Sequence, residues 1–190
     1  KIKSKDNISV YWNKVYEPDQ IKLDKKIIEL FDKNKINSKS FKGNVLNEYN
    51  KVTKDDGTPY KVYSPFWRYG EQVYLESVPS KQLNLKKQTK KVKYFKSNFK
   101  AEQILPKYKW FKKFEKYWIP SEKESEKFLN EFTKSGISKY GIDRDFPSIN
   151  GTSKLSPYIR NGQIHVSDIW EKCYKFKSKS VSAKKFLNEL

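Results

Sequence analysis

The stretch most suited to chemistry is the run GTSKLSPYIRNG, residues 151–162, which gathers small and polar side chains in a lysine-rich chain. Its hydroxyl and cationic side chains are Thr152, Ser153, Lys154 and Ser156. Hydroxyls, backbone N–H groups and a cation ahead of a helix favour an anion, because the helix dipole and the unpaired N–H groups point toward it. The run therefore predicts a phosphate or pyrophosphate site, although Ser, Thr and Gly before a helix are also common in a plain loop and cap.

Known nucleotide motifs do not account for this run. The spacing G-x-x-x-x-G-K of a P-loop is absent, and no G-x-G-x-x-G follows a predicted strand. Pro157 instead suits the first turn of a helix that continues through Tyr158 and Ile159. The elements around this helix must therefore position the hydroxyls.

The charge of the chain suggests a polyanionic partner such as nucleic acid. Its 190 residues hold 41 Lys and Arg against 22 Asp and Glu, a formal net charge of +19, and lysine contacts to phosphates release counterions whatever the base sequence. Only Arg68, Arg144 and Arg160 are arginines. The coding bias of an AT-rich genome, which favours Lys, Asn and Ile together, is an equally good explanation of the charge.

Several functional classes are disfavoured by composition. Cys173 and His165 are the only residues of their types, so an internal disulfide framework is excluded and no metal site is expected. Aromatic residues make up 16% of the chain, which indicates a folded protein. The sequence has neither an apolar run of membrane-spanning length nor a signal-peptide pattern, so we expect a cytoplasmic protein without membrane contact.

The first third of the chain has the pattern of an α/β domain. Residues 8–13, ISVYWN, form a β-branched and aromatic run that predicts a buried strand. Apolar positions between 19 and 34 lie mostly on one face of a helix, and residues 36–41 predict a second strand. Turn residues then fill 47–64, and a helix is expected over 65–76 with proline in its first turn.

Residues 77–119 interrupt this order with a lysine-rich segment that has no sustained period. It predicts an extended linker between domains. The lysines alternate with aromatic side chains, including Tyr94, Phe95, Phe99, Tyr108 and Trp110. Such a segment can stack the bases of single-stranded nucleic acid, or its rings can simply pin a long linker onto a globular body.

After Pro120 the pattern becomes helical. SEKE, beginning at Ser121, is a capping box that starts a helix with an apolar stripe lasting to Gly136. Further helices are expected over 167–176 and 182–190. The C-terminal third is therefore predicted to be all-α.

Beyond these patterns, residues 140–170 strongly resemble the segment of the DNA photolyase and cryptochrome family that opens the flavin-binding helical domain. GTPYKVYSPFWR at 57–68 is similar to the end of the family's α/β domain, and VYWNKVYEPDQIKLDKKI at 10–27 to one of its strands and helices. LPKYKWFKKFEKYWIPSEKESEKFLNEF at 105–132 resembles the family's entry into the helical domain. The resemblance covers essentially the whole chain.

The resemblance implies a fold class and a domain plan. Residues 1–76 would be the C-terminal part of a Rossmann-like α/β antenna domain, 77–119 the linker between domains, and 120–190 the N-terminal part of an all-α FAD-binding domain. GTSKLSPYI is most like the class I cyclobutane pyrimidine dimer photolyases. The parent would be a monomeric light-dependent enzyme that uses reduced FAD to split dimers in damaged DNA.

The resemblance also implies which side chains would act. The family's flavin contacts match Tyr140, Thr152, Ser153, Lys154, Leu155 and Ser156, the run from 152 to 156 holding the FAD pyrophosphate. Lys154 replaces the usual arginine, which keeps the charge but loses the bidentate fork. Arg144 would face DNA phosphate, or would form a local salt bridge with Asp143 or Asp145. His165 is expected at a surface or interhelical position without a catalytic role.

Parts of the family's machinery have no counterpart in this chain. We expect no catalytic residue here, and an isolated fragment with little FAD affinity and no repair activity. Asp19 and Gln20 occupy places where some members contact a folate antenna. The rest of that antenna site is expected outside this chain, so a folate or deazaflavin antenna stays unassigned. A cryptochrome-type photoreceptor, or a non-enzymatic lysine-rich DNA-binding protein, are the alternative functions.

Overall fold

A computed structural model describes residues 9–77, 100 and 104–190 of the chain. Its internal contacts divide the chain into two compact units, one formed by residues 1–76 with 120–190 and the other by residues 77–119. Each unit is described by itself. The predicted aromatic positions Tyr94, Phe95 and Phe99 lie outside the described residues.

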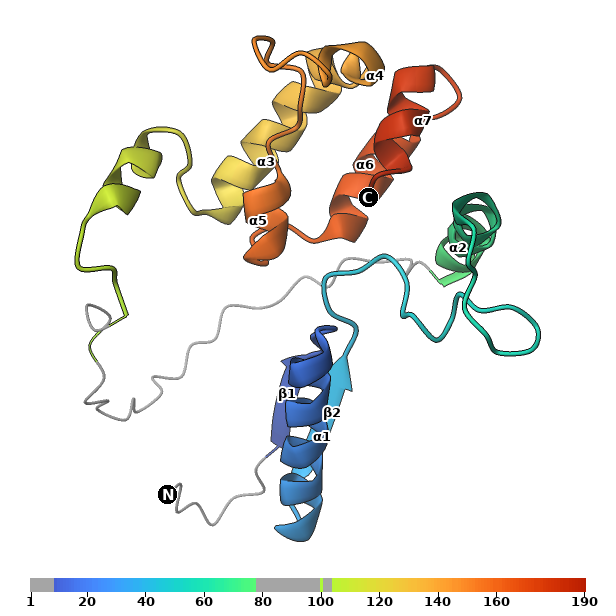
Figure 1. The fold of residues 1–190 in the computed structure, drawn as a ribbon, viewed down its shortest axis with the longest axis vertical. Coiled ribbons are helices and arrows are strands. Elements are labelled where there is room, and N and C mark those ends of the chain that lie inside the picture. The colour runs from blue at the N-terminus through green and yellow to red at the C-terminus, as the bar shows by residue number, and fades with distance from the viewer. Residues whose placement is uncertain (1–8, 78–99, 101–103) are drawn as a thin grey trace, which may run out of the picture. The chain divides into compact units, whose positions relative to one another are not determined.

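Two parallel strands and the helix between them open the first unit (Figure 1). Strand β1, Ser9–Asn13, pairs with β2, Asn37–Phe41, in a register that aligns Ser9 with Asn37 and Asn13 with Phe41. Helix α1, Pro18–Lys33, makes the connection that a parallel pair requires. Trp12 packs on Phe31 of this helix, with the two ring centroids 6.0 Å apart, and its indole N–H donates to Asp24 at 3.2 Å. The predicted order of strand, helix and strand is confirmed.

The prediction that the first strand is buried was wrong. Exposed and half-buried side chains alternate along both strands, and Tyr11 is 61% exposed. Helix α1 has no buried residue. A strand is buried on both faces only when further strands and helices cover it, and among the described residues the sheet has two strands.

A loop and a second helix follow the sheet. The loop turns at Gly57, whose φ of +77° is a left-handed conformation, next to Asp56, which accepts a hydrogen bond from the Thr58 N–H at 2.9 Å. Helix α2, Tyr63–Ser77, begins two residues before the expected position, which leaves Pro65 in its first turn as predicted. Tyr74 of this helix is buried.

The rest of the first unit is helical, as expected. Its helices are α3, Glu122–Glu131; a single π turn, Phe132–Gly136; α4, Tyr140–Asp143; α5, Ser156–Arg160; α6, Val166–Tyr174; and α7, Val181–Leu187. Ser121 caps α3 by accepting from the Glu124 N–H at 3.1 Å, which confirms that half of the capping box. Pro157 lies in the first turn of α5. The α/β pattern followed by an all-α segment is thus confirmed for the described residues.

The principal core of the unit lies among these helices. Leu155, Ile169, Trp170, Cys173, Ala183 and Leu187 are each at most 1% exposed. Phe132 and Phe186 extend it toward α4, with their ring centroids 4.6 Å apart. The segment that carries the predicted phosphate site is therefore anchored in a packed helical core, through Leu155.

In the second unit the described residues 104–119 contain one short 3-10 helix, η2, Trp110–Lys116. None of the helices in the described part of the chain is long and apolar enough to cross a membrane.

Candidate functional site

The predicted phosphate run is held against the end of α4 by Gly151. This glycine is buried, and a Cβ added to it would lie 2.4 Å from the backbone carbonyl carbon of Asp143. Real Cβ contacts are never this short, so only glycine permits so close an approach of the two backbones. The close packing fixes where the following residues, 152–156, leave the core.

Lys154 has an uncommon backbone conformation for a residue with a side chain. Its φ is +55°, in the left-handed region, and the next residue, Leu155, returns to the right-handed helical region with φ −86° and ψ −14°. Successive residues of opposite hand direct neighbouring N–H groups toward one point, which makes an anion-binding concavity. Such a conformation costs on the order of 1 kcal/mol, and the buried side chain of Leu155 helps to hold it in place.

The N–H groups of this turn are available for a ligand. Within the described residues, those of Thr152, Ser153 and Lys154 donate no hydrogen bond, whereas that of Leu155 donates to the Ser153 hydroxyl at 3.4 Å. The Lys154 ammonium forms no ion pair in the same part of the chain. Three free donors and an uncompensated cation suit a phosphate group.

Two hollows flank the turn. One, of about 280 Å³, is lined by Thr152, Ser153 and Lys154, but also by the carboxylate residue Glu131 of α3. The other, of about 410 Å³, is lined by Thr152, Lys154 and Arg144, together with uncharged residues from 146 to 150. The second hollow has no acidic residue among its lining, and this makes it the more favourable of the two for an anion. Its unpaired cation is Lys154, because Arg144 already forms ion pairs with carboxylates.

The structure brings only part of the predicted set together. Thr152 and Lys154 line both hollows and Ser153 lines one, whereas Ser156, the exposed first residue of α5, lines neither. Leu155 is 1% exposed and packs in the core. Leu155 therefore anchors the segment ahead of α5, and Thr152, Ser153 and Lys154 are the residues placed to contact a ligand.

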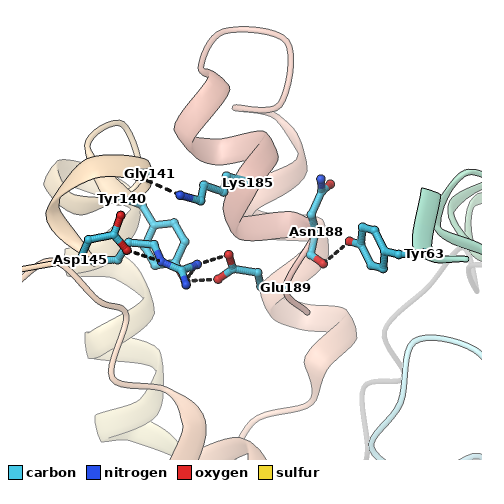
Figure 2. Close-up of polar contacts among 8 residues, drawn as sticks. Tyr63, Tyr140, Gly141, Asp145, Lys185, Asn188 and Glu189 are labelled. Atoms are coloured by element: carbon cyan, nitrogen blue, oxygen red, sulfur yellow. Dashed lines mark hydrogen bonds and ion pairs between the residues drawn. The ribbon is translucent and has the colours of Figure 1, made fainter.

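Tyr140 lies apart from both hollows, in an aromatic cluster. Its ring contacts Phe132 at 5.8 Å and Phe186 at 5.0 Å between centroids, in both cases edge to face. Its hydroxyl donates to the Glu189 carboxylate at 2.5 Å (Figure 2). Burial, and then the hydrogen bond to Glu189, raise the pKa of Tyr140 to about 12, so the phenol is neutral at physiological pH.

Arg144 joins this cluster to the second hollow. Its guanidinium lies 5.4 Å from the centre of the Tyr140 ring and forms ion pairs with Glu189 and, at 3.3 Å, with Asp145. The local salt bridge with Asp145, one of the two alternatives for Arg144, is therefore present. Lys185 of α7 closes the same region by donating to the Gly141 carbonyl at 3.1 Å.

Glu189 is the residue that the sequence did not indicate. It follows α7 and lies 49 residues from Tyr140 and 45 from Arg144, so no local spacing connects them. Only the packing of α4 against α7 brings the three side chains together.

His165 has a structural position, between elements, as expected. Its Nδ1 accepts from the Ser167 N–H at 3.1 Å, which caps α6, and its Nε2 donates to the Gly43 carbonyl at 3.0 Å. Asn44 adds two bonds here, by accepting from the Val166 N–H at 3.0 Å and by donating to the Ile159 carbonyl. The loop after β2 is thereby tied to the ends of α5 and α6.

Comparison with known proteins supports one family. The sequence profile described as DNA photolyase matches residues 2–84. A deoxyribodipyrimidine photo-lyase from Agrobacterium fabrum is 32% identical over 165 residues, 85% of this chain and 34% of that protein. A cryptochrome-2 from Arabidopsis thaliana is 23% identical over 189 residues, 88% of this chain and 28% of that protein.

A solved structure agrees with these matches. A bacterial class III photolyase from Agrobacterium tumefaciens superimposes with a TM-score of 0.74 at 27% identity, covering 95% of this chain and 38% of that one. The chain therefore spans about a third of the length of the relatives that it matches.

Proposed function

We propose, from the support that the profile match and the homologues give for the DNA photolyase and cryptochrome family, that this chain is part of a flavoenzyme that repairs cyclobutane pyrimidine dimers in light. The repair activity would belong to the longer protein, because the chain corresponds to about a third of its relatives. Its own contribution would be to hold one end of the cofactor. The observation that carries this proposal is the turn at 152–154, with its free N–H groups and unpaired Lys154.

The residues of this turn fit the pyrophosphate of FAD. Thr152 and Lys154 line both hollows and Ser153 lines one of them, and the three residues offer free N–H groups, hydroxyls and an ammonium. Phosphate oxygens accept hydrogen bonds from all three kinds of donor. Ser156 would contact the ligand from the first turn of α5, as the family resemblance implies. When bound and reduced, FAD supplies the electron that opens the dimer.

Tyr140 and Arg144 would have supporting roles. The Tyr140 hydroxyl is hydrogen bonded to Glu189, so any contribution to the cofactor would come through the position of its ring. Arg144, with its side chain 31% exposed, retains enough exposed surface to meet a DNA phosphate. A dimer extruded from the duplex would then approach from the exposed side of the site. Its extrusion would cost little, because a damaged base is poorly stacked.

Two observations bear on the photolyase class. The run GTSKLSPYI favours class I, whereas the solved structure described above is a class III photolyase, and a cyclobutane dimer photolyase is common to both. The same proposal includes a cytoplasmic location, a monomeric parent and an antenna chromophore whose identity stays open.

The decisive experiment uses the full-length protein that contains this chain. Purified protein loaded with FAD is given an oligonucleotide with one cyclobutane dimer, and restored thymines are measured in blue light and in the dark. Repair in light alone supports the proposal. Stable FAD binding without repair would instead favour a photoreceptor, and lesion-independent DNA binding without FAD would favour a plain DNA-binding protein.

A paired measurement tests the site itself. Lys154→Glu should reduce FAD retention strongly, because it places a carboxylate beside the pyrophosphate, and Lys134→Glu, also an exposed lysine of the helical segment, is the matched control. Equal FAD retention by both variants would reject the turn at 152–154 as the pyrophosphate site. The isolated 190-residue chain should retain little FAD and show no repair.

A further inference from the structure

The described part of the second unit carries an exposed surface that the proposed flavin site does not use. Residues 104–119 contain a single acidic residue, Glu115, and five lysines: Lys107, Lys109, Lys112, Lys113 and Lys116. All the side chains of this segment are exposed except those of Phe111 and Trp118. Tyr108 is 75% exposed and Trp110 is 58% exposed. Contiguous large rings left open in this way mark an interaction site.

The 3-10 helix η2 arranges the rings in a row. The centroids of Trp110 and Phe114 lie 5.9 Å apart, and those of Phe114 and Trp118 lie 6.2 Å apart. Trp118, the half-buried member, anchors the end of the row, while Trp110 and Phe114 remain open. A short helix that fixes its rings in this way presents ring surface with little further loss of side-chain freedom on binding.

Cations accompany the aromatic residues of this segment. The ammonium of Lys107 is 5.9 Å from the ring centre of Tyr108, and that of Lys116 is 5.8 Å from the ring centre of Tyr117. Lys112 and Lys113 lie between the rings of Phe111 and Phe114 in the sequence. A surface that alternates aromatic faces with positive charge matches a polymer that alternates flat bases with phosphates.

We infer that residues 104–119 form a docking surface for single-stranded nucleic acid, with unpaired bases stacked on Trp110 and Phe114 and phosphates held by the neighbouring lysines. Duplex would fit less well, because its base faces are already stacked. A membrane surface is disfavoured, since an interfacial helix separates its cations and apolar residues onto opposite faces, whereas here they alternate along a seven-residue helix. The inference does not depend on the proposed repair function, on flavin or on a lesion.

The test measures binding of the 190-residue chain, in the dark, to a fluorescein-labelled undamaged oligothymidine by anisotropy over a range of salt. Trp110→Ala should weaken binding about tenfold, the effect of losing one base–ring stack, and Trp110→Phe should retain most of the affinity. The triple substitution of Lys109, Lys112 and Lys113 by Gln should lower the slope of log affinity against log salt by about 2.

Matched controls separate this surface from the charge of the whole chain. Tyr49, 71% exposed, is replaced by Ala as the aromatic control. Lys25, Lys26 and Lys33 on the exposed face of α1 are replaced together by Gln as the charge control. Circular dichroism establishes that every variant is folded before binding is compared.

Three results would overturn the inference. The controls could weaken binding as much as the surface variants, which would assign the binding to net charge alone. A duplex of the same length could bind as tightly as the single strand, which would exclude base stacking. Finally, vesicles of phosphatidylglycerol could respond to the Trp110 and lysine substitutions while the oligothymidine did not, which would assign the surface to lipid.

Discussion

The Tyr140 hydroxyl donates its hydrogen bond to the Glu189 carboxylate (Figure 2), and the same carboxylate forms an ion pair with Arg144. One carboxylate therefore contacts both the buried Tyr140 phenol and Arg144, and of these two residues Arg144 lines the second hollow. Because the Tyr140 side chain is almost fully buried, removing Glu189 leaves the phenol O–H without its acceptor, and the long 3.4 Å bond from Arg144 is then its remaining contact in the described part of the chain. The same carboxylate is one of the two that hold Arg144, Asp145 being the other.

We expect Glu189→Ala to lower the free energy of unfolding by about 1–2 kcal/mol, because the buried Tyr140 hydroxyl loses its acceptor. Glu189→Gln keeps an acceptor and should cost less. The control is Asp145→Asn, which removes the more exposed partner of Arg144 and should change stability by less than about 0.5 kcal/mol. Urea unfolding followed by circular dichroism measures all three, and equal effects of Glu189→Ala and Asp145→Asn would refute the role given to Glu189.

The raised pKa of Tyr140 predicts a loss of stability in alkali. In the folded chain this phenol keeps its proton up to about pH 12, whereas the ordinary value is 10.0. The contribution of the Tyr140 phenol to the free energy of unfolding is therefore complete below about pH 10. It is lost as the pH rises toward 12, because the unfolded state releases a proton that the folded state keeps.

This group is tested by comparing the wild-type chain with Tyr140→Phe, with the urea midpoint of unfolding measured between about pH 10 and about pH 12. The urea midpoint of the Phe variant should fall less steeply with pH than that of the wild type. Tyr49→Phe, at an exposed position, should follow the wild-type curve. Parallel curves for wild type and Tyr140→Phe would show that the phenol ionises alike in both states.

Two glycine substitutions should differ clearly in their effect on stability. Gly151→Ala places a methyl group 2.4 Å from the Asp143 backbone and should destabilise the chain by several kcal/mol, or displace the turn at 152–156. Gly70→Ala places its methyl group at an ordinary 3.6 Å from the nearest atoms, within helix α2. It should be neutral or stabilising by up to about 1 kcal/mol. Thermal melts measure both, and a harmless Gly151→Ala would disprove the close approach.

The left-handed conformation of Lys154 predicts that one substitution will raise the stability of the chain and lower its retention of FAD. Lys154→Gly should stabilise the free chain by up to about 1 kcal/mol, because glycine adopts a positive φ without strain. The same variant should retain less FAD in the full-length protein, since the ammonium is lost. Lys154→Arg keeps the charge and should retain FAD. A Gly variant that retains FAD as well as wild type would show that the cation has no part in binding.

The two hydrogen bonds of His165 can be separated by substitution, according to how much each contributes to stability. His165→Asn keeps a side chain that caps α6 but is too short for the Gly43 carbonyl, whereas His165→Ala loses both bonds. We expect losses of about 1 kcal/mol for Asn and about 2 kcal/mol for Ala. If both variants unfolded at the same urea concentration, the capping bond would have no measurable value.

Local rules predicted the elements of this chain well and the environment of its side chains less well. The pattern of apolar residues predicted the strands, α1, α6 and α7, and the proline and serine signals predicted the starts of α2, α3 and α5, because these depend on neighbours in the sequence. The short helix α4 was not predicted. The burial of β1 was predicted wrongly, since it depends on which other strands cover the sheet.

In the candidate site, too, local features could be predicted from the sequence and contacts between distant segments could not. The hydroxyls and the cation between 152 and 156 could be identified from their types, and their place ahead of α5 from Pro157. The close approach of Gly151 to Asp143, the left-handed Lys154 and the participation of Glu189 could not, because each depends on contacts between segments that only the tertiary fold brings together.

The ties between the loop after β2 and the helical segment also affect how the chain folds. The Gly43 and Asn44 contacts with His165 and Val166 span 122 residues, against 12 for the bond between Trp12 and Asp24. By the logarithmic dependence of loop closure on length, the longer loop costs about 2 kcal/mol more entropy to close. During synthesis β1, α1 and β2 can form early, whereas the loop that follows them must wait for most of the chain to leave the ribosome before it gains its partners.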